Sequence, residues 1–220
     1  MQKTKPARTF TLGEIIANAV THGIGTALAI AGLAILVAFA SLHGDAWHVV
    51  SASIYGATLI FLYLFSTLYH SVLGPRVSHV LRIFDHAAIF LLIAGTYTPF
   101  TLVTLRGPLG WTLFGIVWGM ALFGVSFQTT LLRRHVGISL GLYIGMGWAV
   151  IVAARPLMEA LPMPGMILLA SGGLAYTFGV IFYVWHRLPY HHAIWHLFVL
   201  AGSVLHFFAI LLYVMSNTHG

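Results

Sequence analysis

Seven apolar stretches, each about as long as a bilayer-spanning helix, dominate the sequence. A transmembrane helix needs about 20 consecutive, mostly apolar residues. Stretches of this kind cover residues 18–42, 48–72, 82–104, 109–130, 137–155, 164–186 and 192–215. The breaks between them contain glycine, proline or arginine, including Arg133-Arg134 and the region from Pro156 to Pro164. We therefore predict an all-α polytopic membrane protein with seven transmembrane helices.

The composition agrees with a chain that lies almost entirely in the bilayer. Only 6% of the residues are charged and the mean hydropathy is +0.95, whereas soluble domains carry about 25% charged residues. The seven stretches use up most of the 220 residues, so we predict one domain over residues 1–220, with residues 1–13 as a short cytoplasmic tail. The net charge of +6 is scattered over short loops, which argues against nucleic acid as a partner.

The basic residues distinguish the two sides of the predicted bundle. Eight of the ten lysines and arginines fall on the side of the N-terminus, and only Arg106 and Arg155 fall on the other. The positive-inside rule then predicts a cytoplasmic N-terminus and an extracytoplasmic C-terminus. Small size and short loops favour an integral protein of a bacterial inner (plasma) membrane.

Eight polar residues on four helices converge on the cytoplasmic leaflet in this topology: Glu14, Asn18, His22, Ser66, His70, Asp85, His192 and His196. His192 and His196 lie four residues apart, which places both imidazoles on one face of the last helix. Ser66 and His70 share a face near the cytoplasmic end of the second helix, and Asp85 is the one acidic residue inside an apolar stretch. The chain contains no cysteine, so a metal would have to be bound by His, Asp or Glu.

Three histidines, a carboxylate and a serine at one depth are typical of a functional site, because ionisable groups inside a membrane need partners. Three neutral imidazoles and a water molecule are the ligands of a catalytic zinc ion. We therefore predict a zinc ion bound by His70, His192 and His196. Asp85 would orient or deprotonate the water, and Ser66 would donate a hydrogen bond to a developing oxyanion.

Each of these residues also has an interpretation without chemistry. Asp85 is interpreted alternatively as a helix N-cap, and Ser66 as a serine bonded to the backbone of its own helix. Four further histidines near predicted helix ends are interpreted as interfacial anchors; they are His79, His135, His186 and His191. A bis-histidine haem site would also use histidines, but three histidines with one aspartate fit zinc better.

The first helix carries a polar stripe of its own. Glu14, Asn18, Thr21 and His22 recur at i, i+4, i+7 and i+8, so they share one helical face. We interpret Glu14 and Asn18 as a structural stripe or cap. His206 follows His192 by fourteen residues, which is about 21 Å along a helix, and we do not expect it to share the site.

Several of these motifs resemble those of one family. Ser-Thr-Leu-Tyr-His at 66–70, Asp85 and His-Ala-Ile-Trp-His at 192–196, on seven predicted helices, resemble the hemolysin III branch of the progestin and adiponectin receptor (PAQR) family. The segment 14–22, with its Asn-x-x-Thr-His, is similar to that family's first motif. The wider group resembles the alkaline ceramidases, which are metal-dependent amide hydrolases of membranes. The resemblance implies that His70, His192 and His196 bind zinc, while Asp85 handles the water and Ser66 supports the site.

Three functions follow as hypotheses. The leading one is a zinc-dependent hydrolase of a lipid amide or ester at the cytoplasmic leaflet, with a membrane lipid as substrate. The alternative is a non-enzymatic protein of membrane homeostasis or sensing, in which zinc is structural. The third is an ion or proton pathway, because aspartate and histidine inside membranes often form relays.

Overall fold

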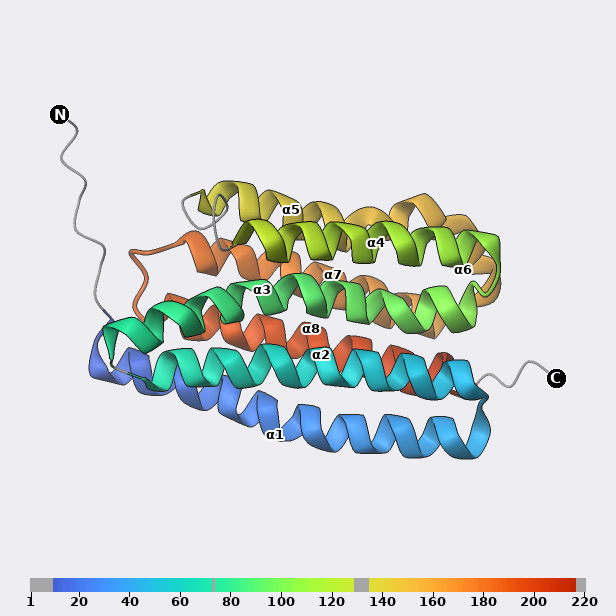
Figure 1. The fold of residues 1–220 in the computed structure, drawn as a ribbon, viewed down its shortest axis with the longest axis horizontal. Helices are drawn as coiled ribbons and strands as arrows, with labels where there is room; N and C mark the ends of the chain where they lie inside the picture. The colour runs from blue at the N-terminus through green and yellow to red at the C-terminus, as the bar shows by residue number, and fades with distance from the viewer. Residues whose placement is uncertain (1–9, 73, 129–134, 217–220) are drawn as a thin grey trace.

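The computed structural model describes residues 10–72, 74–128 and 135–216, which form an antiparallel bundle of helices (Figure 1). Its elements are α1 (Leu12–His43), α2 (Ala46–Ser71), α3 (Pro75–Pro99), the π-helical turn η1 (Phe100–Thr104), α4 (Pro108–Gln128), α5 (Val136–Trp148), the 3₁₀ turn η3 (Ala149–Ala153), α6 (Ala154–Ala160), α7 (Met163–Val184) and α8 (His191–Tyr213). Within the described residues, seven segments are long and apolar enough to cross a membrane, with α5, η3 and α6 forming one of them. The prediction of an all-α protein with seven spans is therefore confirmed.

Two helices begin well before the predicted positions, because polar residues can occupy a first helical turn. α1 begins at Leu12 rather than at 18, and a capping box stabilises its start. In this box the Glu14 carboxylate accepts the Thr11 N–H at 2.9 Å, and the Thr11 hydroxyl accepts the Glu14 N–H at 3.3 Å. α3 begins at Pro75 rather than at 82, since proline at the first helical position removes only an N–H that has no helical partner.

The fifth span differs from its prediction at its end and in its interior. It continues to Ala160 rather than 155, so the predicted break does not begin at Pro156, which lies in the first turn of α6. The interruption comes earlier, at η3, because the Tyr97 hydroxyl lies between two backbone groups. It donates to the Met146 carbonyl at 2.9 Å and accepts the Val150 N–H at 2.7 Å, so it replaces a bond of the helical ladder. The predicted break at Arg133-Arg134 lies outside the described residues.

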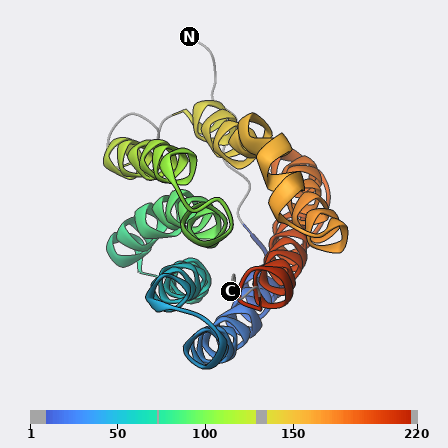
Figure 2. The same cartoon turned by 90° about the vertical axis from the view of Figure 1, so that its right-hand side faces the viewer.

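α3 is the central helix of the bundle. In its most apolar stretch 78% of the residues are buried, against 50% or less in each of the other spans. It packs against α2 and α4, while α1 contacts α8 and closes the other side. Figure 2 shows α1 and α8 next to each other, opposite α4 and α5. α3 therefore presents side chains to the interior of the bundle along most of its length.

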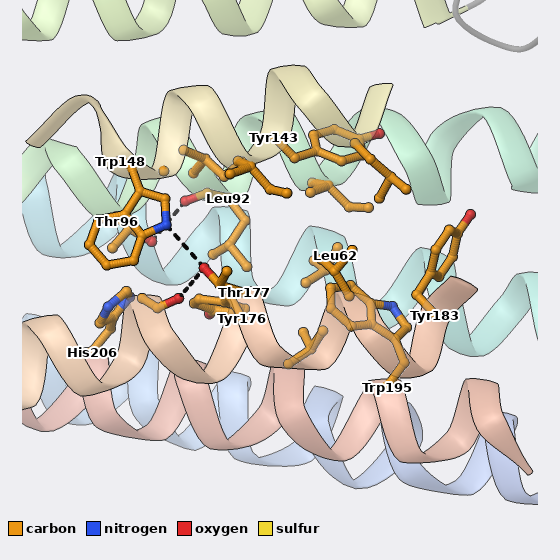
Figure 3. A pocket seen from close by; sticks show the side chains of 18 of the residues that line it. Leu62, Leu92, Thr96, Tyr143, Trp148, Tyr176, Thr177, Tyr183, Trp195 and His206 are labelled. Atoms are coloured by element: carbon orange, nitrogen blue, oxygen red, sulfur yellow. Dashed lines mark hydrogen bonds between the residues drawn. The ribbon is translucent and has the colours of Figure 1, made fainter. Parts of the chain in front are cut away.

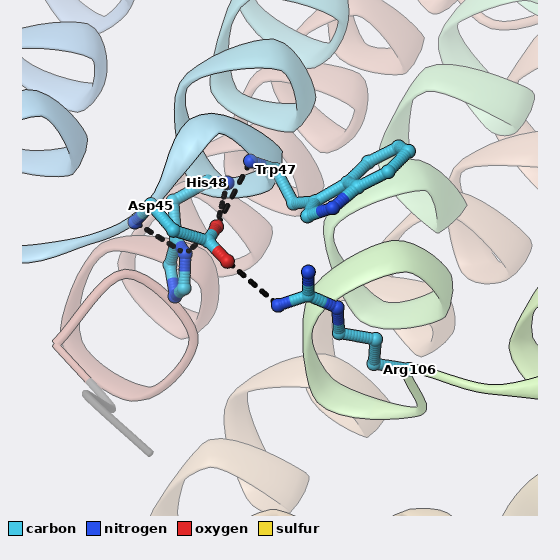
Figure 4. Close-up of polar contacts among 4 residues, drawn as sticks. All are labelled: Asp45, Trp47, His48 and Arg106. Atoms are coloured by element: carbon cyan, nitrogen blue, oxygen red, sulfur yellow. Dashed lines mark hydrogen bonds and ion pairs between the residues drawn. The ribbon is translucent and has the colours of Figure 1, made fainter. Parts of the chain in front are cut away.

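At the end of the bundle where α8 ends, which we call the C-terminal end, one aspartate joins two turns (Figure 4). Asp45 caps α2 by accepting the backbone N–H groups of Trp47 at 2.9 Å and His48 at 3.2 Å. Its second carboxylate oxygen pairs with Arg106 at 2.6 Å. Hydrogen bonds from the His48 side chain and from Arg106 hold the pKa of the Asp45 carboxyl below its usual range. The turn between α1 and α2 is thereby tied to the turn before α4.

At the opposite end, which we call the N-terminal end, Glu14 joins the starts of α1 and α8. Besides its role in the capping box, it accepts the backbone N–H of Tyr190 at 3.0 Å. Tyr190 has φ 56°, a left-handed conformation that is uncommon for a residue with a side chain. The interpretation of Glu14 as a structural cap is confirmed, and the same carboxylate fixes the turn that leads into α8.

We predict that Glu14→Ala lowers the free energy of unfolding by about 2 kcal/mol. Loss of the cap and loss of the acceptor for the Tyr190 N–H should each cost about 1 kcal/mol. Unfolding of the purified protein in detergent would measure the effect. Glu159→Ala is the matched control, because Glu159 is 66% exposed and pairs with Arg155 at the surface, so its loss should change little. Equal stability of the two variants would contradict the role of Glu14.

Candidate metal centre

Three histidines meet inside the N-terminal end of the bundle. His70 lies in the last turn of α2, and His192 and His196 lie in the first two turns of α8. Each offers one ring nitrogen, and these three nitrogens lie within 4.8 Å of one another. His70 and His196 are buried, and His192 is half-buried. We call these three residues the histidine triad.

The hydrogen bonding of the triad leaves nitrogen lone pairs free for a metal. His196 Nδ1 lies 3.2 Å from the Asn18 carbonyl oxygen and 3.1 Å from the Thr21 hydroxyl. Because a carbonyl oxygen only accepts, Nδ1 carries the proton and Nε2 is left with its lone pair. His70 Nε2 is buried and has no hydrogen-bond partner among the described residues. A buried nitrogen of this kind is costly unless it binds something, so the triad fits a metal ion.

The Asn18 carbonyl and the Thr21 hydroxyl orient a triad member, a role that the sequence did not predict. The helical stripe had placed both residues on one face of α1, but only the packing of α1 against α8 brings them to His196. The Thr21 hydroxyl donates to the Ala17 carbonyl at 2.8 Å, so its oxygen is free to accept the imidazole N–H. Second contacts of this kind fix the tautomer of metal-binding histidines.

His22 lies directly against the triad. Its ring stacks on that of His196, with centroids 3.5 Å apart and planes 15° apart, and meets the edge of Tyr63. His22 is 3% exposed, and neither of its ring nitrogens has a hydrogen-bond partner among the described residues. It does not belong to the group of three histidines whose ring nitrogens lie within 4.8 Å of one another. His22 therefore forms part of the wall of the site, next to the triad.

Asp85 and Ser66 line the same space as His192 and His196. α3 begins ten residues before Asp85, so the alternative that Asp85 is a helix N-cap is wrong. The Asp85 side chain is 13% exposed and lies 3.4 Å from His86 Nδ1, and its carboxylate also interacts with the Ser66 side chain. Asp85 lies outside the group of nitrogens formed by the triad. Its catalytic role, and that of Ser66, stay predictions.

Four histidines were interpreted as interfacial, and none of them belongs to the triad. His79, His135 and His186 are exposed, as expected of interfacial residues. The interfacial interpretation is wrong for His191, which is 4% exposed and has Nδ1 at 3.1 Å from the Phe182 carbonyl. This contact ties the start of α8 to the last turns of α7.

A cavity of about 190 Å³ runs from the triad toward the middle of the bundle, between α3, α5, α7 and α8. Its wall is mostly apolar and aromatic. Tyr183 and Trp195 lie toward one end, and Trp148 and His206 toward the other (Figure 3). Asp85, Ser66 and two triad histidines also line it. The polar site thus opens into a long space suited to an apolar chain.

Fold and site together define a polytopic membrane protein of seven apolar helices with a buried histidine triad at one end. The chain belongs to the Haemolysin-III related family, which it matches over residues 10–207. It is 54% identical to Hemolysin-3 of Bacillus cereus over 202 residues, which cover 92% of each chain. It is 49% identical to the Hemolysin-3 homolog of Bacillus subtilis (strain 168), with 93% of this chain and 96% of that protein covered.

A human protein is also similar to the chain. The monocyte to macrophage differentiation factor of Homo sapiens is 31% identical over 210 residues, with 93% of this chain and 86% of that protein covered. The predicted resemblance to the hemolysin III branch is therefore confirmed. The chain is an integral membrane protein with close bacterial homologues.

Proposed function

We propose that the protein is a zinc-dependent hydrolase that cleaves an amide or ester bond of a membrane lipid at the N-terminal end of the bundle. The observation that carries the proposal is that two members of the histidine triad, His192 and His196, line a mostly apolar cavity. This arrangement would hold a lipid head group near a metal and its chain inside the bundle. A metal site lined only by polar residues would offer no apolar surface to bind a lipid chain.

Zinc is the metal that the triad suits best. The chain has no thiolate to offer, and three imidazoles leave one tetrahedral position open. A zinc ion held by His70, His192 and His196 would supply a Lewis acid, which polarises a carbonyl and lowers the pKa of water. The Asn18 carbonyl and the Thr21 hydroxyl would keep the His196 ring in its binding tautomer.

Two further side chains would accept the proton of the attacking water and stabilise the negative charge that forms on the carbonyl oxygen. Asp85 would take a proton from the attacking water and return it to the nitrogen or oxygen that leaves when its bond to the carbonyl carbon breaks. Its carboxylate faces the same cavity without belonging to the ligand group. Ser66, which is 1% exposed, interacts with the Asp85 carboxylate; once Asp85 has taken the proton, the Ser66 hydroxyl would donate a hydrogen bond to the oxygen that gains charge. His86 Nδ1 lies 2.9 Å from the Arg82 carbonyl oxygen, to which it donates, and 3.4 Å from the Asp85 carboxylate.

The alternatives have less support. A structural zinc site is usually closed by four protein ligands, whereas the described residues bring three together. A proton relay would need a continuous polar chain along the bundle. Tyr63, Ser203 and Tyr176 are joined by hydrogen bonds of 2.7 and 2.8 Å, but in the part of the chain that the structure describes no hydrogen bond joins them to the triad.

We place the site at the cytoplasmic leaflet. The excess of lysine and arginine at the N-terminal end supports this orientation. A reporter enzyme fused after Ser216 would then be active only outside the cytoplasm. Activity of that fusion in the cytoplasm would instead assign the site to the outer leaflet, and the proposed chemistry would be unaffected.

Hydrolysis by the purified protein tests the proposal. We expect the zinc-loaded protein, reconstituted with an N-acylated lipid such as a ceramide, to release free fatty acid. Removal of the metal with a chelator should stop the release, and added zinc should restore it. Lipid analysis of cells with and without the protein extends the search to esters. If no lipid is cleaved in vitro and no lipid pool changes in cells, the hydrolase proposal is wrong.

A further inference from the structure

The end of the cavity that is remote from the triad is polar, although an acyl chain would end there in a methyl group. His206 of α8 lines this end together with Trp148 of α5 and Thr96 of α3 (Figure 3). It follows His196 by ten residues, which is about 15 Å along a helix. Its side chain is 7% exposed, so it is a buried histidine that the proposed reaction does not use.

One hydrogen bond fixes the tautomer of His206. Nε2 lies 3.0 Å from the Leu169 carbonyl oxygen, and because this oxygen only accepts, Nε2 carries the proton. A side chain at Gly172 would overlap the Nε2 and Cδ2 atoms of the ring, so α7 packs tightly against this edge. Nδ1 is then a hydrogen-bond acceptor held in a fixed position, and it has no partner among the described residues.

In the described part of the chain, the polar side chains beside this nitrogen donate to other groups. The Thr96 hydroxyl donates to the Leu92 carbonyl at 2.8 Å, and the Thr177 hydroxyl donates to the Gly173 carbonyl at 2.8 Å. The Trp148 indole N–H is bonded to Thr177 at 3.0 Å. The one carboxylate that lines the cavity, Asp85, lies toward the triad. A charged imidazole without a counter-ion is costly inside a membrane, which leaves His206 neutral.

The distance from the triad matches the length of one lipid chain. The hydrocarbon core of a bilayer is about 30 Å thick, so one chain spans about 15 Å. A chain whose head group lies at the triad would therefore place its far end close to His206. A methyl group there would leave Nδ1 unsatisfied, whereas a hydroxyl would donate to it.

We propose that the remote end of the cavity is a subsite for a hydroxyl group at the far end of an acyl chain, with His206 Nδ1 as its acceptor. The preferred ligand is then an amphiphile that is polar at both ends. The inference rests on the proposed function for the placement of the head group at the triad, but it concerns binding and not cleavage.

A competition experiment with two fatty acids tests the subsite. The probes are hexadecanoic acid and 16-hydroxyhexadecanoic acid, each displacing a fluorescent fatty acid from the zinc-loaded protein in detergent. The readout is the affinity ratio of the hydroxylated to the plain acid, compared between the wild type and His206→Leu. Because one hydrogen bond is at stake, we expect this ratio to fall by about five- to tenfold in the variant.

Two further variants complete the experiment. His206→Gln keeps both a donor and an acceptor and should retain most of the preference. If His206→Leu does not fold, equal affinity of the wild type for the two acids would overturn the subsite. Ile144→Leu changes the cavity wall without a polar group, so the ratio should stay at the wild-type value. An equal affinity ratio in the wild type and both His206 variants would overturn the subsite, because it would mean that His206 Nδ1 does not bind the hydroxyl of the acid. Neither acid is cleaved by a hydrolase, so failure of the hydrolase proposal leaves this result interpretable.

Discussion

His196→Ala and His192→Ala should each lower zinc affinity by more than about 100-fold. Loss of a residue that only orients a metal ligand costs about 10–100-fold, and loss of a ligand itself should cost more. We expect about one zinc ion per wild-type chain in elemental analysis of the purified protein, and far less in either variant. His70→Ala should behave in the same way, since its Nε2 has no other partner among the described residues.

Two histidines outside the triad provide controls. His22→Phe keeps an aromatic ring stacked on His196, and because His22 lies outside the ligand group the zinc content should be unchanged. His79→Ala alters an exposed residue and should also leave it unchanged. Full retention of zinc by a His192→Ala, His196→Ala double variant would show that the triad is not the metal site.

The convergence of the triad was predictable because it depends on helical periodicity and on the number of spans. A spacing of four residues places His192 and His196 on one helical face. The four spans between α2 and α8, an even number, bring the end of α2 to the same end of the bundle as the start of α8. Neither inference requires a particular packing arrangement, and the structure places the three nitrogens within 4.8 Å.

Features that depend on contacts between distant helices were not predictable. The acceptor for His196 Nδ1 is the backbone carbonyl of Asn18, and a carbonyl leaves no signature in the sequence. The interruption of the fifth span depends on Tyr97 reaching from α3 to α5. The polar cavity end at His206 requires the packing of α7 against α8 around Gly172.

Helix starts were also misplaced, for a reason that matters to the site. Hydropathy detects the part of a helix that lies in hydrocarbon, whereas α3 begins at Pro75, before its apolar stretch. Because the helix was predicted to start at residue 82, Asp85 lay near its start and could be interpreted as an N-cap. The earlier start places the residue well inside the helix, where its carboxylate caps nothing and faces the cavity. Burial of an aspartate at such a position favours a functional role.

Asp85→Asn should lower the turnover of a lipid amide by about 10²–10⁴, the usual contribution of one general base. The amide keeps the size of the side chain but cannot take a proton. Zinc should stay nearly in place, because Asp85 lies outside the ligand group and residues that do not touch the metal seldom abolish its binding. Turnover per zinc-loaded chain, measured together with zinc content, separates the two effects.

Ser66→Ala is the companion variant, because it removes a hydroxyl beside Asp85 and leaves the proposed general base in place. We expect it to lower turnover by up to about 10²–10³ if the hydroxyl stabilises the oxyanion, again with zinc retained. The two variants together distinguish a catalytic site from a structural one. If Asp85 instead completed a closed zinc site, Asp85→Asn would lose the metal while Ser66→Ala would keep it, and no lipid pool would respond to either. That pattern would contradict the hydrolase and support a structural metal.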